Sequence, residues 1–560
     1  MPRDFVPLAE QIVDDLLLAD PELSRSVGDH RADHRLPDFS DAGVRAQVAD
    51  LRQASDVLAE VDPDVSPPAS PALSASPALS TSPALSTSPA LSTAEDAVDL
   101  ELLSAAVDAR LFALTELREH EWNPLVHNPG FLLHGLIVRP TAPAEERLEA
   151  LVARLEALPD ALDTAGRILT DTPAVHAETA LTQWDGTERL IRDEIPAFAD
   201  QVEGGSKRIR RPVDDALDAV ARHRDRLGEL RAQPGRDPRL GARLWEAKLW
   251  HTLDSDLTAT ELHARAEADL DRLSEEIADV AAQLTGDRNV RAALDLLAAD
   301  HPDNDTIVGK AAAALAATTD FVRAHGLVSV VGDPCEIVEM PEFARGVAVA
   351  YCDAPGPLEP APVPTFFAIS PTPADWSPAR VESFYREYND HLLHGLTVHE
   401  AMPGHHVQLA HSRRFRGSTR VRAMCGSGSF IEGWAVYAER LMTDAGYGGL
   451  PVKLQQLKMQ LRMTINALLD RGVHAGDLSE ADALALMTGR GFQEEGEATG
   501  KWRRALLTSA QLSTYFVGYT EMAAIAAARP AGTEPREWHD AMLAHGSPSP
   551  RHLARLLGVS

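Results

Sequence analysis

Residues 397–408 read TVHEAMPGHHVQ and lie in a region, residues 391–411, that holds six of the chain's 21 histidines. The pair His399-Glu400 resembles the start of HExxH, a helical motif in which two histidines one turn apart bind zinc and the glutamate activates a water molecule. The segment therefore predicts a metal-binding helix, with His399 as a ligand and Glu400 as the general base. The alternative is a histidine-rich helix that faces only solvent or a neighbouring helix.

The second histidine is displaced from the HExxH spacing. Position i+4 from His399 is Pro403, and the next histidines are His405 and His406. On a straight helix His406 would share the face of His399 but lie about 10 Å along the axis, too far to bind the same ion. Because proline removes a helical hydrogen bond and Gly404 permits unusual dihedral angles, a local bulge could bring His405 to the required place. We therefore favour His405 as the second ligand and keep His406 as the alternative, or as a substrate contact.

A second segment, residues 430–439, reads FIEGWAVYAE and supplies a carboxylate. Glu432 follows His399 by 33 residues, which suits a helix, a connection and a second helix that returns antiparallel. A glutamate there would complete a His₂Glu zinc site with its fourth position open. Glu439 lies on the same helix face and is placed to orient a ligand from behind. We predict one Zn²⁺ per chain, held by His399, His405 and Glu432; the alternative for Glu432 is a buried, salt-bridged carboxylate.

Further polar residues could complete a substrate site. Gln511 and Tyr515 are four residues apart and share a helix face. A tyrosine hydroxyl can stabilise the oxyanion of an acyl-transfer reaction, and an arginine such as Arg504 can hold a substrate carboxylate. His474, four residues after Asp470, could add polar groups to the same cavity. The alternatives are a structural tyrosine at 515 and a helix cap at 470–474.

Most of the remaining chain has the 3.6-residue hydrophobic period of amphipathic helices. The clearest helices are expected at residues 8–18, 96–117, 143–157 and 261–284. Short β-rich runs occur in the middle of the chain, at residues 327–331, 346–351 and 365–369. We expect a mainly α protein with one small β-sheet inserted just before the histidine segment.

A low-complexity tract divides the chain. From residue 70 to residue 93 the sequence repeats SPALSA or SPALST, and a proline at every sixth position excludes a continuous helix. This tract predicts a loop over residues 66–94, between an N-terminal helical segment (1–65) and a helical lobe (95–325). Residues 326–560 are expected to form the catalytic lobe, with the sheet and the HEAMPGHH and EGWAVYAE helices.

Composition limits the partners. The chain has 84 acidic and 53 basic residues and a net charge of −31, which disfavours nucleic acid and anionic membranes as partners. Three cysteines cannot form a disulfide framework. The first residues have neither a basic region nor a long apolar core, and apolar runs are shorter than the roughly 18 residues of a membrane span. These features predict a cytoplasmic protein.

The segments HEAMPGHHVQ, FIEGWAVYAE and QLSTYFVG together resemble a bacterial family of unknown function, domain-of-unknown-function family 885. The segment ADPELSRSVGDHRADHRLPDFS near the start also resembles it, more weakly. The resemblance implies a large, mostly helical, zincin-like fold related to metallopeptidases with a glutamate ligand. It implies that Glu432 corresponds to the zinc-binding glutamate of a Glu-Gly-Phe-Ala pattern, His399 to the first ligand, Glu400 to the general base and Tyr515 to the oxyanion-stabilising tyrosine.

Two departures from the family pattern stand out. The second histidine is displaced relative to HExxH, and residues 461–466 (LRMTIN) lack the paired arginines expected there, which predicts different substrate contacts. The favoured hypothesis is a zinc-dependent hydrolase that cleaves an amide bond in a small peptide or similar substrate. The alternatives are a catalytically degenerate scaffold with a binding or structural role, and a non-haem iron oxidoreductase, since His/Glu clusters on helices also suit iron.

Overall fold

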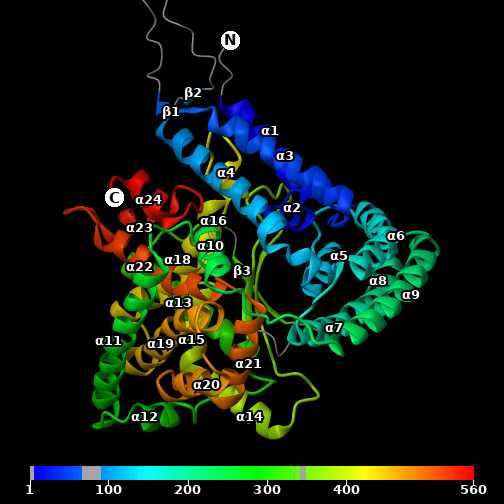
Figure 1. Cartoon of the computed structure of the whole chain (residues 1–560). Helices are drawn as coiled ribbons and strands as arrows, with labels where there is room; N and C mark the ends of the chain where they lie inside the picture. Colours follow the sequence, from blue (N-terminus) through cyan, green and yellow to red (C-terminus); the bar gives the residue numbers. More distant parts are fainter. Residues whose placement is uncertain (1–4, 66–89, 92, 333, 341–348, 560) are drawn as a thin grey trace, which may run out of the picture.

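Helices form most of the chain in the computed structural model, which describes residues 5–65, 90–91, 93–332, 334–340 and 349–559 (Figure 1). The elements of the N-terminal part are α1 (Phe5–Ala19), α2 (Pro21–Val27), η1 (His30–Ala32), α3 (Asp41–Ala59), β1 (Asp62–Val65), β2 (Ala90–Leu91), α4 (Ala94–Phe112), η2 (Ala113–Leu117), η3 (Glu119–Glu121), η4 (Pro124–His127), α5 (Gly130–Val138), α6 (Ala144–Ile168), α7 (Ala174–Arg189), η5 (Leu190–Glu194), α8 (Ile195–Ala199), α9 (Gly205–Arg231), α10 (Ala242–Leu253), α11 (Ala259–Thr285), α12 (Val290–Leu297) and α13 (Ile307–His325).

The C-terminal part contains the histidine segment and the small sheet. Its elements are β3 (Cys335–Glu339), β4 (Ala350–Asp353), β5 (Thr365–Ile369), α14 (Pro378–Glu387), α15 (Asp390–Glu400), α16 (His405–Ser412), α17 (Val421–Met424), α18 (Gly428–Asp444), α19 (Gly449–His474), α20 (Glu480–Gly489), α21 (Glu495–Leu507), η7 (Gln511–Ser513), α22 (Thr514–Ala527), α23 (Pro535–Leu543) and α24 (Pro550–Leu557).

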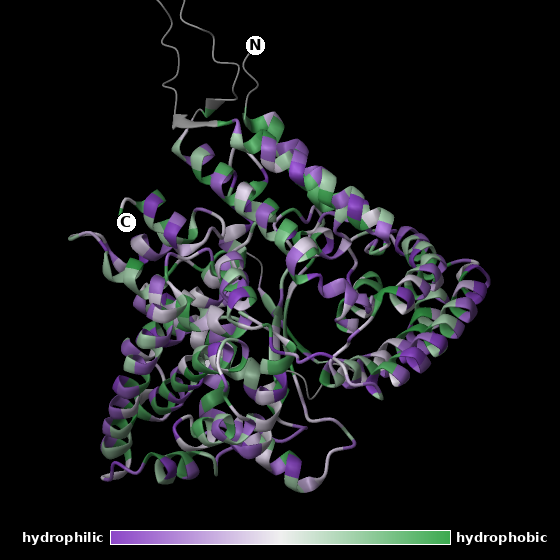
Figure 2. Ribbon diagram, viewed as in Figure 1, coloured by the Kyte–Doolittle hydropathy of each residue, from purple (hydrophilic) through white to green (hydrophobic). Residues whose placement is uncertain are grey.

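The mainly α architecture with one small inserted sheet is confirmed. The four helices expected from hydrophobic period lie in α1, in α4 with the turn η2, in α6 and in α11. Figure 2 shows hydrophilic and hydrophobic residues sharing long peripheral helices such as α9 and α11. Of the tract predicted as a loop, residues 66–89 and 92 lie outside the described residues, whereas Ala90–Leu91 pair with β1 and Thr93 caps α4.

The small sheet has the strand order β3-β5-β4, with β3 parallel and β4 antiparallel to β5. The strand expected at 365–369 is β5, and the one expected at 346–351 is found as Ala350–Asp353. The strand expected at 327–331 is wrong. Side chains take up the backbone groups of Ser329, whose N–H donates to Asp540 at 2.8 Å and whose carbonyl lies 2.9 Å from Nε2 of His411.

Buried hydrophobic side chains of the described residues fall into four clusters, and these clusters cross the regions expected from sequence. One cluster joins α1, α3 and α4 to Val421 and Met424, and a second lies within residues 133–230. A third joins residues 245–297 to α19 and the start of α22, and a fourth joins α13 and the sheet to α15, α16 and α18. Helix α18 thus contributes to both the third and the fourth clusters, and the histidine segment belongs to the fourth.

Two glycines set the separation of α18 and α22. A Cβ atom on Gly433 would lie 2.4 Å from the carbonyl carbon of Gly518, and one on Gly518 would lie 2.1 Å from the carbonyl oxygen of Ser429. Side chains at these positions would therefore force the helices apart. Since Gly433 follows Glu432 and Gly518 lies one turn after Tyr515, this contact holds the two candidate site residues on facing helices. No described helix is both long and apolar enough to cross a membrane.

Candidate metal centre

His399 and His405 come together because one helix ends between them and another begins. Helix α15 ends at Glu400 and α16 begins at His405, so the expected bulge within one helix is replaced by a tight turn. The N–H of Gly404 donates to the carbonyl of Val398 at 2.9 Å, which folds the turn back onto the helix. Only glycine fits there, because a Cβ atom on Gly404 would lie 1.9 Å from the carbonyl oxygen of His399.

Trp434, in the FIEGWAVYAE motif, stabilises this turn. Trp434 is fully buried, and its Nε1–H donates to the carbonyl of Pro403 at 2.9 Å. Trp434 lies two residues after Glu432, so one short stretch of α18 both presents the carboxylate and fixes the loop that carries His405. This positioning contact is not predicted by the sequence patterns above, although the Glu-Gly-Trp-Ala pattern contained the signal.

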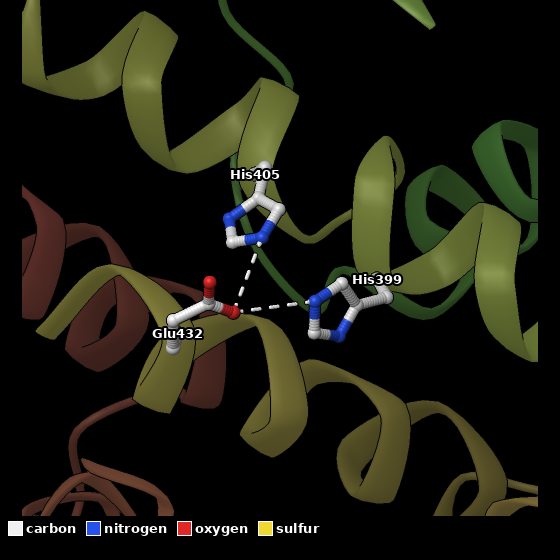
Figure 3. Close-up of side chains that lie close together, drawn as sticks. All are labelled: His399, His405 and Glu432. Atoms are coloured by element: carbon white, nitrogen blue, oxygen red, sulfur yellow. Dashed lines mark ion pairs between the residues drawn. The ribbon is translucent and has the colours of Figure 1, made fainter. Parts of the chain in front are cut away.

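The turn brings His399, His405 and Glu432 together (Figure 3). Oε2 of Glu432 lies 3.4 Å from Nε2 of His399 and 3.5 Å from Nε2 of His405. The two imidazole rings are nearly perpendicular, at 87°, with centroids 4.7 Å apart. One potential ligand atom from each residue lies within 4.8 Å of the others. These are the three residues predicted as metal ligands.

The spacing suits a tetrahedral ion better than hydrogen bonds. Two ligands that each lie about 2.0–2.1 Å from a tetrahedral zinc ion are about 3.3–3.4 Å apart. The observed separations of 3.4 and 3.5 Å match this value and exceed the usual length of a hydrogen bond between nitrogen and oxygen. Oε2 of Glu432 is buried and accepts no hydrogen bond from any described residue. The donor set of two imidazoles and one carboxylate therefore fits a zinc ion.

The electrostatics favour an ionised ligand. Burial acts to raise the pKa of the Glu432 carboxyl, but the facing imidazoles of His399 and His405 outweigh it and hold this pKa well below its usual range. A carboxylate that stays deprotonated at neutral pH is ready to bind a cation without first losing a proton.

Glu439 lies behind His399, as predicted from its place on the helix. Its Oε1 lies 2.7 Å from Nδ1 of His399, and both side chains are largely buried. A carboxylate at that nitrogen keeps the proton on Nδ1 and leaves Nε2 free to face Glu432 and His405. Burial raises the pKa of Glu439, and its hydrogen bond with His399 opposes this rise.

Glu400, the predicted general base, is the last residue of α15 and is buried. It lies close enough to the sheet for its charge to contribute, after burial, to raising the pKa of the Cys352 thiol in β4. Its charge also acts on His399. Glu400 is therefore close to both His399 and β4, which is an edge strand of the described sheet.

The predicted residues near the start of α22 form a chain of contacts. Arg504 donates to Oε1 of Gln511 at 2.9 Å, and Nε2 of Gln511 donates to the hydroxyl of Tyr515 at 3.4 Å. Burial raises the pKa of Tyr515, and the nearby charge of Glu432 raises it further. Tyr515 thus remains a neutral hydrogen-bond donor close to the carboxylate ligand.

Asp470 stabilises the turn at residues 510–513, between α21 and α22. The sequence had left open whether Asp470 lines a cavity or caps a helix end. The residue is fully buried and accepts hydrogen bonds from Nε1 of Trp245 at 3.1 Å and from the backbone N–H of Ala510 at 3.0 Å. It also accepts from the N–H and hydroxyl of Ser513, at 3.2 and 2.6 Å. Ala510 has a left-handed φ of 66°, so the carboxylate stabilises a conformation that alanine rarely adopts.

Of the two histidines predicted as substrate contacts, His474 is bonded to backbone groups, and His406 follows His405 on α16. Nε2 of His474 lies 2.9 Å from the carbonyls of Ala505 and Thr508, and Nδ1 accepts from the N–H of Leu240 at 3.4 Å. Both ring nitrogens of His474 are therefore engaged by backbone groups, Nε2 at the end of α21 and Nδ1 just before α10. His406 is buried on α16 and is not among the three residues whose ligand atoms cluster.

Solved structures of two proteins resemble the whole chain. A candidate lipoprotein of unknown function from Shewanella oneidensis is 26% identical, with a TM-score of 0.78, over 99% of this chain and 100% of that chain. A candidate lipoprotein from Colwellia psychrerythraea is 15% identical, with a TM-score of 0.78, over 99% of this chain and 98% of that chain, and shows the shared fold alone. No curated protein matched the chain.

These comparisons correct one expectation and establish the family. Lipoproteins are exported and lipid-anchored proteins, so the description of the Shewanella oneidensis neighbour contradicts the expected cytoplasmic location. The family described as "Bacterial protein of unknown function (DUF885)" matches residues 21–557, almost the whole chain. The protein therefore belongs to the DUF885 family of bacterial proteins of unknown function.

Proposed function

We propose that this protein is a zinc-dependent hydrolase, with a zincin-like site, that cleaves an amide bond in a short peptide or peptide-like substrate. The observation that carries the proposal is the spacing of the donors: Glu432 Oε2 lies 3.4 and 3.5 Å from the two histidine nitrogens and has no hydrogen-bond partner among the described residues. A zinc ion held there would supply a Lewis acid that activates water and polarises the scissile carbonyl.

The residues around the cluster have distinct roles in this reaction. Glu400, which follows His399 directly on α15, takes the proton from the attacking water and returns it to the leaving amine. Tyr515 keeps its proton and donates a hydrogen bond to the oxyanion that forms on the carbonyl oxygen. Glu439 orients His399. β4 is an edge strand of the described sheet, and such a strand can pair with an extended peptide backbone.

Metal content and activity test the proposal together. We expect purified wild-type protein, reconstituted with zinc, to bind about one zinc ion per chain, and Glu432→Ala to bind almost none, because the variant removes one of three ligands. Glu400→Gln should keep its zinc but lose at least about 100-fold in the rate of peptide hydrolysis, the usual contribution of a general base. Elemental analysis and an assay with a mixture of short peptides measure both quantities.

Asp444→Asn is the matched control. Asp444 ends the same helix α18, half-exposed, and pairs with Arg440 and Lys453 away from the cluster. It should leave zinc content and hydrolysis unchanged. Wild-type protein that binds zinc without hydrolysing any peptide would support the degenerate scaffold instead. Protein that binds iron in preference to zinc and reacts with oxygen would support the oxidoreductase.

A further inference from the structure

A cavity of about 250 Å³ lies between the N-terminal segment and the catalytic part of the chain. Its wall includes Arg25 of α2, Arg139 after α5, Arg154 of α6, Cys352 of β4 and Leu409 of α16. The cavity is smaller than the roughly 300–1,000 Å³ of pockets for drug-sized ligands, so it suits a small group. The lining holds three arginines and His30 together with the carboxylates of Asp33, Asp353 and Glu359.

Two residues that line the cavity, Leu409 and Cys352, relate it to the histidine cluster. Leu409 lies one turn after His405 on α16, and therefore on the same helix face. Cys352 lines the cavity, and the charge of Glu400 contributes to raising the pKa of its thiol. A substrate bound at the cluster can thus extend past β4 into the cavity.

The N-terminal motif that the proposed reaction does not use forms one side of this cavity. The N–H of Leu358 donates to the carbonyl of Val27 at 2.8 Å. A Cβ atom on Gly28 would lie 2.5 Å from the backbone nitrogen of Glu359, and one on Gly356 would lie 2.1 Å from the carbonyl carbon of Val27. The close contact of two backbone segments explains the glycine of the SRSVGDH sequence and places Arg25 in the wall.

Every carboxylate in the wall already has a cationic partner. Arg139 pairs with Asp353, and Nε of Arg139 donates to that carboxylate at 3.2 Å. His30 lies 2.9 Å from both Asp33 and Glu359. The hydrogen bond with Asp33, opposed by burial and reinforced by Glu359, raises the pKa of His30 to about 9, so His30 carries a charge at neutral pH.

One nitrogen of the Arg154 guanidinium has no hydrogen-bond acceptor among the described residues. Its side chain is 1% exposed, and its Nε donates to the carbonyl of Arg35 at 3.0 Å while Nη1 donates to that of Leu132. Its buried Nη2 makes no hydrogen bond within the described part of the chain, and the nearest carboxylate oxygen, on Asp33, is 3.8 Å away.

Arg25 makes no close ion pair with a described residue, although the charges of Asp353, Glu22 and Asp33 act on it from a greater distance. Among the described residues no carboxylate lies within salt-bridge distance of its guanidinium, and its buried Nε has no hydrogen-bond partner. An arginine stays charged even when largely buried, and a buried charge without a partner is costly. A ligand anion would remove that cost.

We propose that this cavity binds a carboxylate of the substrate, held by the unpaired guanidinium of Arg25 beside Nη2 of Arg154. A guanidinium presents two parallel N–H groups that match the two oxygens of a carboxylate. The identity of the ligand as a substrate group rests on the proposed hydrolase function. The carboxylate is either the free carboxyl terminus of a short peptide or an acidic side chain near the scissile bond.

Calorimetric titration of zinc-loaded Glu400→Gln protein, which should not turn substrate over, tests the proposal by binding alone. Three probes distinguish a terminal carboxylate from a side-chain carboxylate: N-acetyl-Ala-Ala, its carboxamide, and N-acetyl-Ala-Glu carboxamide. We expect at least one carboxylate probe to bind at least tenfold more tightly than the uncharged carboxamide. Arg25→Gln, added to the same background, should abolish that difference. The probe that is favoured identifies a terminal or a side-chain carboxylate.

Controls make the outcome decisive. Arg25→Lys keeps the charge without the planar fork and should retain part of the preference, and Arg211→Gln, whose side chain on α9 is 91% exposed, should retain all of it. Melting temperatures show that each variant is folded. Equal binding of all three probes, or a preference that survives Arg25→Gln, would overturn the proposal. Wild-type protein that binds carboxylates through Arg25 but hydrolyses nothing would refute the hydrolase and leave the anion site standing.

Discussion

Replacing Glu439 tests whether the buried carboxylate behind His399 prepares this histidine for a metal. The hydrogen bond between them is 2.7 Å long, and the Glu439 side chain is only 6% exposed, so water cannot readily replace it. A charge-assisted hydrogen bond of this kind contributes about 1.5–3 kcal/mol, and loss of such a partner typically weakens metal binding about 10–100-fold. Since tenfold corresponds to about 1.4 kcal/mol, the two figures agree.

Two substitutions of Glu439 separate the contribution of its charge from the contribution of its hydrogen bond to His399. Glu439→Gln keeps an acceptor oxygen but loses the charge, so we expect zinc to bind about tenfold more weakly. Glu439→Ala also leaves the Nδ1–H of His399 without a partner, so we expect a loss of about 100-fold. Competition with a chromophoric chelator at pH 7.5 measures both dissociation constants. Zinc affinity within twofold of the wild type for a folded Glu439→Ala protein would refute the reasoning.

Two further variants test the packing and the electrostatics around the site. Gly433→Ala should destabilise the protein by about 1–3 kcal/mol in urea unfolding, because its Cβ atom would lie 2.4 Å from the backbone of Gly518, whereas Gly500→Ala, with nothing within 4 Å, should not. Burial raises the pKa of Glu521 to about 7, so stability falls as pH rises from about 4.5 to about 7. Glu521→Gln should therefore gain up to about 3 kcal/mol over the wild type at pH 8 and little at pH 4; an equal effect at both values would contradict this.

Local patterns were enough to predict the helices and one strand. The expected segments at 8–18, 143–157 and 261–284 all lie in helices, because an apolar stripe of period 3.6 can be buried only in that conformation. The strand at 365–369 was found with the expected bounds. The strand expected at 327–331 failed because side chains distant in sequence, Asp540 and His411, bind the backbone of Ser329. Such long-range competition leaves no trace in local hydrophobicity.

The sequence by itself determined the kinds of groups available to the site: two histidines and a glutamate in motifs 33 residues apart. It also placed Glu439 on the same helix face as Glu432. Only the tertiary structure decided that His405 faces Glu432, because the turn at Gly404 depends on Trp434 of another helix. Only the tertiary structure joined Arg25 to β4, more than 300 residues later in the chain. Residue type follows from the local chain, whereas the distance between remote side chains follows from how helices pack, and metal and anion sites depend on that distance.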